Sequence, residues 1–329
     1  MGKRTMAILR RGQFLRLIVP LLVRVRFTTL RERKAMGRMQ RRVGPRTVGP
    51  FGLLQPLADG RKLAFKQPVV PTSRRVPLYL GAPVLRFTTR MLGWLVVPLA
   101  STRVVVESPY RLLFLFRVSR LEVYGIMFAG WRSNSKYAFL GCLRSAAQMV
   151  SYEVCLGLLL LRAIFPRGTL HFGEIVRLQE EGSWFLWSQF PVAFRYGIRM
   201  LAETNRAPFD LPEREAELVA GYNVEYGSMG FALFFLGEYR RMRALARLRS
   251  ILWLGGWSAP RSGRLWSWIP GSAWMGLKTR RILFGYIWVR ARFPRYRYDQ
   301  LMRIGWQVLL PLSMLFFLLV RVMTLLVSR

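Results

Sequence analysis

Long apolar segments are the feature that most constrains what this chain can fold into. Residues Ile304–Val320 form a run of 17 residues without a charge, close to the roughly 20 apolar residues that cross hydrocarbon as a helix. Ile8–Leu30 is a weaker candidate because five arginines interrupt it. Together with six similar segments, these predict an all-α, polytopic membrane protein with about eight transmembrane helices. The six segments are Pro77–Ala100, Tyr110–Phe128, Tyr137–Phe165, Trp184–Leu201, Glu217–Tyr239 and Trp274–Phe293.

Four polar segments would connect these helices on one side of the membrane, within a single membrane domain over residues 1–329. The first, residues 31–76, contains spaced apolar residues between Phe51 and Phe65 that predict a short amphipathic helix at the membrane surface. Positive-inside counting places this side in the cytoplasm or matrix, although Arg240–Arg264, on the opposite side, carries seven arginines. The other three are Gly130–Lys136, the acidic segment 202–221 and Phe293–Arg303.

The chain is strongly basic, with 46 arginines, six lysines and a formal net charge of +36. In a soluble protein this charge would suggest nucleic-acid binding. Here the arginines are scattered through apolar runs, which favours contact with anionic phospholipid such as cardiolipin, or with acidic neighbours, and not nucleic acid. Several arginines are paired at helical spacing and would share a helix face: Arg86 and Arg90, Arg117 and Arg120, Arg195 and Arg199.

The sequence offers no ligand set for a metal cofactor. Cys142 and Cys155 lie thirteen residues apart in one expected helix, and His171 is the one histidine. This is too few donors at metal-ligand spacing for an iron–sulfur cluster, haem or zinc. No glycine-rich phosphate-binding signature follows a strand.

The carboxylates are concentrated in one region, since seven of the sixteen fall between Glu203 and Glu238. Within it, the loop ETNRAPFDLPE interleaves charged and apolar residues, and Pro208 and Pro212 prevent a regular helix. This pattern predicts a packed loop with paired charges, an arrangement that shifts pKa values and suits proton transfer. Its candidate functional residues are Glu203, Arg206, Asp210 and Glu213.

Further acids lie in segments expected to be in the membrane, where an ionisable residue is a functional candidate by default. On an ideal helix Glu225 and Glu238 would be about 20 Å apart, which suits two positions on an extended path better than one binding site. The alternative to a role for Glu238 on this path is that it lies at the far lipid head groups, beside Arg240 and Arg241. Glu153 lies more than two helical turns from Arg144, so its partner is expected on another helix. Four charges flank the first loop, where solvation and function are equally plausible: Glu32, Arg33, Lys34 and Asp59.

Long motifs resemble NADH dehydrogenase subunit 1 of respiratory complex I, in the family order and spacing. They are GRMQRRVGPRTVGPFGLLQPLADGRKL, SAAQMVSYE, LAETNRAPFDLPEREAELVAGYNVEY and PRYRYDQLM. The resemblance implies an eight-helix subunit of proton-pumping NADH:quinone oxidoreductase that forms the ubiquinone chamber with neighbouring subunits. It also implies that electrons arrive from an iron–sulfur cluster in an adjoining subunit, and that an acidic path couples quinone reduction to proton translocation.

The resemblance also assigns residues, though no complete active site is expected in this chain alone. It places seven at the quinone chamber: Glu32, Arg33, Asp59, Glu203, Arg206, Asp210 and Glu213. It places six on the proton path: Glu153, Arg144, Glu215, Glu217, Glu225 and Glu238. The implied location is the mitochondrial inner membrane, with a bacterial plasma membrane as the alternative.

Two departures from the family pattern stand out. Gln67 follows Lys66 where the family usually has glutamate, and arginine is unusually abundant in the second, third and seventh expected helices. Two rival functions remain open from the residues alone: a stand-alone proton-coupled transporter or channel, and a purely structural adaptor.

Overall fold

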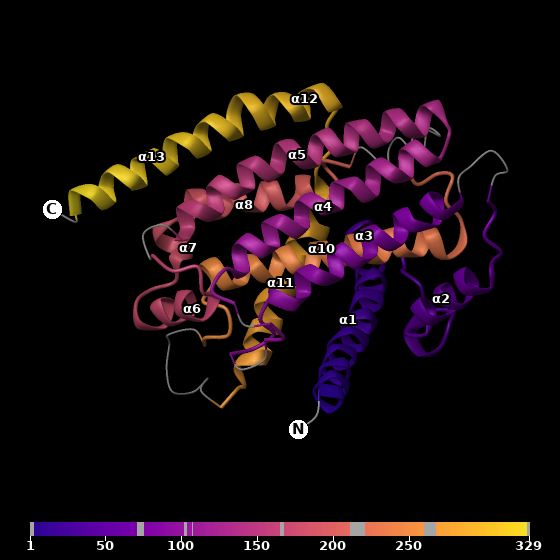
Figure 1. Ribbon diagram of the computed structural model, residues 1–329, viewed down its shortest axis with the longest axis horizontal. Helices are drawn as coiled ribbons and strands as arrows, with labels where there is room; N and C mark the ends of the chain where they lie inside the picture. Colours follow the sequence, from indigo (N-terminus) through magenta and orange to yellow (C-terminus); the bar gives the residue numbers. More distant parts are fainter. Residues whose placement is uncertain are drawn as a thin grey trace.

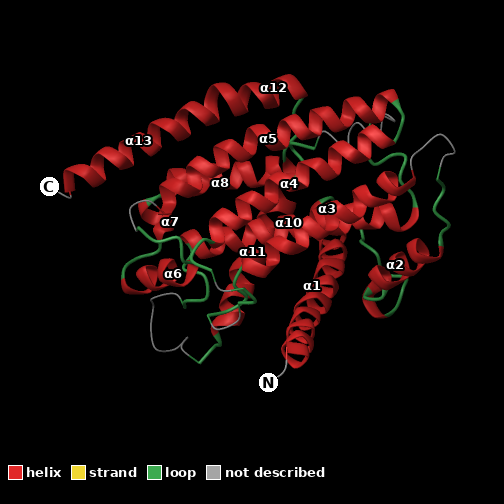
Figure 2. Ribbon diagram, in the orientation of Figure 1, coloured by secondary structure: helices red, strands yellow, loops and turns green. Residues whose placement is uncertain are grey.

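The computed structural model describes residues 3–70, 76–101, 104–106, 108–164, 168–210, 221–259 and 268–327. Within these ranges all regular structure is helical and no strand is present (Figures 1 and 2). The all-α class is confirmed. The elements are α1 (Lys3–Met39), a 3-10 turn (Pro50–Gly52), α2 (Gln55–Phe65), α3 (Val76–Val96), α4 (Arg111–Arg132), α5 (Lys136–Ile164), α6 (Phe172–Glu181), α7 (Phe185–Ser188), α8 (Phe190–Glu203), α10 (Ser228–Trp253), α11 (Gly271–Arg292), α12 (Tyr298–Arg303), a π-helical turn (Ile304–Leu309) and α13 (Leu310–Val327).

Helix α10 is the central element of the bundle. It contacts α1, α2, α3, α6, α7, α8 and α11. In Figure 1 the neighbouring helices α3, α4 and α5 lie side by side, and α13 packs along α5. Any side chain placed along α10 can therefore meet residues from helices that are distant in sequence.

The expected span Trp184–Leu201 is wrong as a single helix. The chain forms α7, breaks at Gln189 (φ −121°, ψ 34°), and continues as α8 with Pro191 in its first turn. Proline lacks a backbone N–H group, but the first residues of a helix have no intrahelical acceptor for theirs. Proline therefore costs little at this position. The short helix α6 precedes this region and was not predicted.

The expected helix Glu217–Tyr239 has different boundaries. Among the described residues, 221–227 form turns, and α10 begins only at Ser228, after extended Gly227 (φ −111°, ψ 177°). Glu225 therefore precedes the helix, so its predicted separation from Glu238 along one helix is wrong. Helix α10 then continues to Trp253 through the first half of the segment predicted as the opposite-side loop, Arg240–Arg264.

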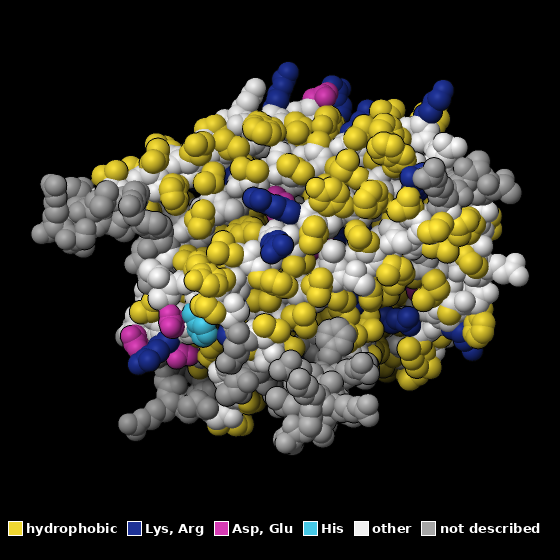
Figure 3. Space-filling view, in the orientation of Figure 1, with side chains coloured by type: hydrophobic (Ala, Val, Ile, Leu, Met, Phe, Trp, Pro, Cys, Tyr) yellow, Lys and Arg dark blue, Asp and Glu magenta, His cyan; other side chains and the backbone are white. Residues whose placement is uncertain are grey.

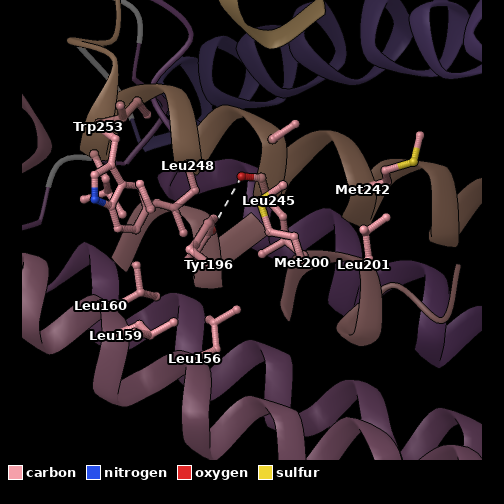
Figure 4. Packing of buried hydrophobic residues seen from close by; sticks show 14 of the residues in the cluster. Leu156, Leu159, Leu160, Tyr196, Met200, Leu201, Met242, Leu245, Leu248 and Trp253 are labelled. Atoms are coloured by element: carbon pink, nitrogen blue, oxygen red, sulfur yellow. Dashed lines mark hydrogen bonds between the residues drawn. The ribbon is translucent and has the colours of Figure 1, made fainter. Parts of the chain in front are cut away.

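The main hydrophobic core joins α5, α8 and α10. Figure 4 shows Leu156, Leu159 and Leu160 of α5 facing α8 and α10. The ring of Tyr196 lies 4.7 Å from that of Trp253, between centroids, and both side chains are fully buried. Burial of aromatic side chains of this size contributes strongly to helix packing.

Among the described residues, one helical stretch, Tyr298–Val320, is long and apolar enough to cross a membrane by length and composition. Other long helices carry more charge: α10 alone contains Glu238 and five arginines. Large apolar side chains nevertheless remain exposed on the outer helices, and apolar atoms dominate the face shown in Figure 3. An extensive apolar surface suits contact with lipid or other subunits. The number of spans, about eight, stays a prediction.

Two glycines allow α4 to pack closely against its neighbours. A Cβ on Gly125 would lie 2.9 Å from Cβ of Arg86 on α3, and one on Gly130 would lie 2.3 Å from Cβ of Cys142 on α5. Neither distance is compatible with a real side chain. The absence of a side chain at these positions therefore sets the spacing between α3, α4 and α5.

We expect Gly130→Ala to destabilise the α4–α5 contact. Overpacking of this kind typically costs about 1–3 kcal/mol. The control is Gly81→Ala in α3, where an added Cβ meets nothing within 4 Å and only the small gain in helix propensity remains. The thermal unfolding midpoints of the purified assemblies should differ, with the Gly130 variant lower; equal midpoints would contradict the close approach.

Candidate functional site: a buried acid–arginine network

Glu32 is the centre of a buried cluster at the end of α1 and is 5% exposed. Its Oε1 accepts hydrogen bonds from Nη1 of Arg206, at 3.1 Å, and from Nη1 of Arg290 on α11, at 2.6 Å. The hydroxyl of Tyr239 on α10 donates to Oε2 at 2.5 Å. Four separate parts of the chain thus converge on one carboxylate.

The backbone after α8 positions Arg206 for this role. Asn205 adopts a left-handed conformation (φ 50°), which turns the chain sharply, and asparagine tolerates this region better than most residues. The Arg206 amide then donates to the Leu201 carbonyl at 3.2 Å. Its guanidinium lies 4.3 Å from the Tyr239 ring centroid, so it is held by stacking as well as by charge.

Arg206 also links Glu32 to a second carboxylate. Its Nε lies 2.5 Å from Oε1 of Glu238 on α10, and both side chains are largely buried. The charge of Glu238 in turn acts on Arg90 of α3. Glu238 is thus paired with Arg206 inside the bundle, and the alternative that places it at the far head groups stays a prediction.

A second cluster adjoins the first through α10, where Arg241 lies one helical turn from Glu238. Glu122 of α4 accepts from Nε of Arg90 at 3.2 Å and from Nη1 of Arg241 at 3.0 Å. Arg241 also forms a short ion pair with Glu203, at the end of α8. Arg241 thus bridges two buried carboxylates from different helices.

The two clusters form one charge-balanced network, linked by Arg90, on which the charges of Glu122 and Glu238 both act. It contains four carboxylates and four arginines, and none of these side chains is more than 22% exposed. Such charges are tolerated inside a protein only when they are paired and hydrogen-bonded. The carboxylates are Glu32, Glu122, Glu203 and Glu238, and the arginines are Arg90, Arg206, Arg241 and Arg290.

The network continues toward α5 through Ser119 and Glu153. Ser119 on α4 donates a short hydrogen bond to Glu153, and the charges acting on Glu153 include those of Arg241 and Glu122. A cavity of about 40 Å³ is lined by Ser119, Glu203 and Arg241. It is large enough for at least one water molecule, and these three side chains are the polar groups of an otherwise apolar lining.

The arginines determine the charge state of Glu32. Burial by itself raises the pKa of this carboxyl group. Arg206, Arg290 and the Tyr239 hydroxyl outweigh burial and hold the pKa below its usual value. Glu32 is therefore ionised at neutral pH, although it is buried.

Comparison with known proteins decides the family. A family model described as NADH dehydrogenase matches residues 12–321. The chain belongs to the NADH dehydrogenase family. It is 55% identical to NADH-ubiquinone oxidoreductase chain 1 of Chondrus crispus over 298 residues, which cover 91% of each chain. It is 55% identical to the protein of the same name from Arabidopsis thaliana (92% of this chain, 93% of the relative). It is 52% identical to an NADH-quinone oxidoreductase subunit of Rhodospirillum rubrum (93% and 91%).

The structure brings together only some of the residues assigned from the family resemblance. Glu32, Arg206, Glu203 and Glu238 share the network described above, and Glu153 adjoins it. Arg33 and Asp59 form a separate ion pair of 3.1 Å between α1 and α2, with side chains 55% and 41% exposed. Glu213, Glu215 and Glu217 lie outside the described residues.

Three other assigned residues lie in different surroundings. Asp210 is buried in the loop after α8. Glu225 is half-buried in the turn before α10, where its backbone carbonyl accepts from the Tyr79 hydroxyl at 2.6 Å. Arg144 is exposed on α5, with its guanidinium 5.9 Å from the Tyr298 ring centroid. Their place on a chamber or path stays a prediction.

Sequence reasoning missed Glu122, whose side chain is 1% exposed. The signal was available, because Glu122 lies in the apolar segment Tyr110–Phe128, and the rule applied to Glu153 selects it equally. Sequence spacing placed Arg90 on one helix face with Arg86, but no sequence signal pointed to Glu122 as the partner of Arg90 or of Arg241. Only the packing of α3, α4 and α10 identifies these pairs.

We expect Arg241→Gln to destabilise the bundle strongly, because Glu203 and Glu122 would both lose a buried partner. Breaking a buried ion pair costs about 3–5 kcal/mol. The control is Arg177→Gln, at the exposed pair with Glu181 (3.1 Å) on α6, which should cost less than about 1 kcal/mol. Unfolding midpoints of the two purified variants measure the difference, and equal shifts would contradict the bridging role.

The lowered pKa of Glu32 predicts a pH-dependent contribution to stability. A lowered pKa means that the ionised carboxylate stabilises the fold at neutral pH, and that this contribution is lost as pH falls through the lowered pKa. The wild type should therefore have a higher thermal unfolding midpoint than Glu32→Gln. This difference should be largest near neutral pH and shrink in strong acid. A difference in unfolding midpoint that stays constant down to about pH 3, below the usual glutamate pKa of about 4.3, would refute the lowered pKa of Glu32.

Proposed function

We propose that this chain, as a membrane subunit of NADH:quinone oxidoreductase, forms part of the quinone chamber and couples quinone reduction to proton translocation through the acid–arginine network. The observation that carries the proposal is the closeness of the two clusters. Arg206 joins Glu32 to Glu238, Arg241 joins Glu122 to Glu203, and the charges of Glu122 and Glu238 both act on Arg90. The small cavity is lined by Glu203 and by Ser119, the hydrogen-bond partner of Glu153. The subunit-level identity rests on the names of its relatives.

The chemistry of quinone explains why such a network is useful. Reduction of a quinone to a quinol consumes two electrons and two protons, so charge and proton demand change together beside the chamber. In a low-dielectric interior, a change of this kind alters the pKa of every coupled carboxylate. Arg241 contacts both Glu203 and Glu122, so it can stabilise the ionised form of either carboxylate.

The path beyond Glu203 would depend on bound water. A proton released from Glu203 can reach Ser119 through water in the 40 Å³ cavity, and Ser119 is hydrogen-bonded to Glu153. Hydroxyl groups and water both donate and accept, so they can relay a proton without carrying a net charge. Glu153 would then be the next station.

The chamber itself would be completed by other subunits. Arg33, the residue after buried Glu32 on α1, and its ion-pair partner Asp59 on α2 supply exposed polar groups. This is the arrangement expected of a chamber wall that faces a partner. The electrons would come from an iron–sulfur cluster in a neighbouring subunit, and the location would be the mitochondrial inner membrane or a bacterial plasma membrane.

Glu203→Gln tests the proposal, because it keeps the shape of the side chain and removes its charge and proton affinity. We expect quinone reduction and proton translocation to fall by about 100-fold, the usual cost of losing a positioned proton-transfer group. Oxidation of NADH with a hydrophilic artificial acceptor, which bypasses the quinone, should stay unchanged.

The matched control is Glu181→Gln, the same substitution at an exposed pair on α6. It should leave both activities at wild-type levels. Normal coupled turnover of the Glu203 variant in a fully assembled complex would refute the proposal and favour a structural adaptor. Proton uptake by the isolated chain without a redox partner would favour a transporter or channel.

A further inference from the structure

A cavity of about 850 Å³ lies between α1, α10 and α11, close to the end of α3. In Figure 1 these helices meet on the side of the bundle where α1 projects toward the N-terminus. The cavity shares no lining residue with the acid–arginine network. It is not used by the function proposed above.

The charge of the cavity lining is entirely positive among the described residues. Five arginines line it and no acid does. The charges that act on Arg243 are those of four other arginines, all from the same lining. This is the opposite of the network, where each arginine faces a carboxylate. The five are Arg24, Arg31, Arg243, Arg247 and Arg280.

Arg247 is the strongest sign that an anion belongs in the cavity. Its side chain is 8% exposed, and its Nε and Nη1 have no hydrogen-bond partner. Its guanidinium lies 5.2 Å from the Trp94 ring centroid, which offers stacking but no counter-charge. A buried cation without a partner is costly, so an anionic ligand that supplied hydrogen-bond acceptors would be strongly favoured.

The rest of the lining is mostly apolar, with Ser272 and Thr279 as its polar members, and indicates the other half of the ligand. Leu21, Phe27 and Leu283 line the cavity together with Trp94. Two further lining residues, Val23 and Leu277, are 47% and 39% exposed, so the cavity reaches the outer surface between α1 and α11. A ligand that fits both parts has an anionic head and hydrocarbon chains.

We propose that this cavity binds an anionic phospholipid, with its phosphate on Arg243 and Arg247 and an acyl chain against the apolar lining. Guanidinium groups bind phosphate oxygens in a two-pronged geometry, and basic pockets between membrane helices suit acidic head groups. The site rests on the proposed location of the chain in a membrane. It does not depend on the coupling role of the network.

Photo-crosslinking of the assembled complex tests the site. The complex is placed in lipid nanodiscs with a trace of phosphatidylglycerol that carries a photoreactive group in an acyl chain, or with the matching phosphatidylcholine. We expect the phosphatidylglycerol probe to label α1 and α11 peptides at least tenfold more than the phosphatidylcholine probe. The double substitution Arg243→Gln/Arg247→Gln should abolish the preference for the phosphatidylglycerol probe. The control is Arg281→Gln, at an exposed arginine of α11 outside the cavity lining, and it should retain the preference.

Equal labelling by the two lipids, or a preference that survives the double substitution, would overturn the proposal. If the double variant fails to assemble, competition in the wild-type complex decides. Unlabelled phosphatidylglycerol should displace the probe and phosphatidylcholine should not, whereas equal displacement would refute the site. Quinone reduction by Glu203→Gln is measured separately, so failure of the coupling proposal leaves the lipid result interpretable.

Discussion

The pairing of buried carboxylates with buried arginines is the interaction on which the rest of the structure depends. Arg206 contacts both Glu32 and Glu238, and Arg241 contacts both Glu122 and Glu203. Each arginine therefore joins two carboxylates that lie on different helices. Since loss of one partner leaves a charge uncompensated in a low-dielectric interior, the network stabilises the bundle and also makes it responsive to a change in charge. Stability and the proposed coupling have the same physical origin.

The arginines fall into groups with different electrostatic surroundings. Those of the network are balanced by glutamates, whereas those of the large cavity face one another. A third group relies on neutral acceptors: Arg199 donates to the Leu309 carbonyl at 2.6 Å, and Arg86 contacts the Tyr222 hydroxyl. Residue type alone does not distinguish these groups. Each group of arginines needs its own kind of partner for the positive charge. Glutamates and neutral oxygen acceptors of this chain supply it for two of the groups.

Sequence reasoning was most reliable where the signal was local. Apolar segments identified most of the long helices, and the acidic loop after α8 was recognised as packed and charged. Helix boundaries failed at α7–α8 and at α10, because single residues such as Gln189 and Gly227 decide where a helix breaks. The site was found in part: Glu32, Glu203 and Glu238 were predicted, and Glu122 was missed although the same rule selects it.

The sequence by itself determined the all-helical class, the family and the acids worth considering, because apolar length, motif spacing and a charge in an apolar segment are properties of neighbouring residues. Only the tertiary structure decided which of those acids act together and with which arginine. Arg206 and Arg290 lie 174 and 258 residues from Glu32 in the chain, yet both bind the same carboxylate oxygen. Pairing over such separations depends on how the helices pack around α10, and no local pattern specifies it.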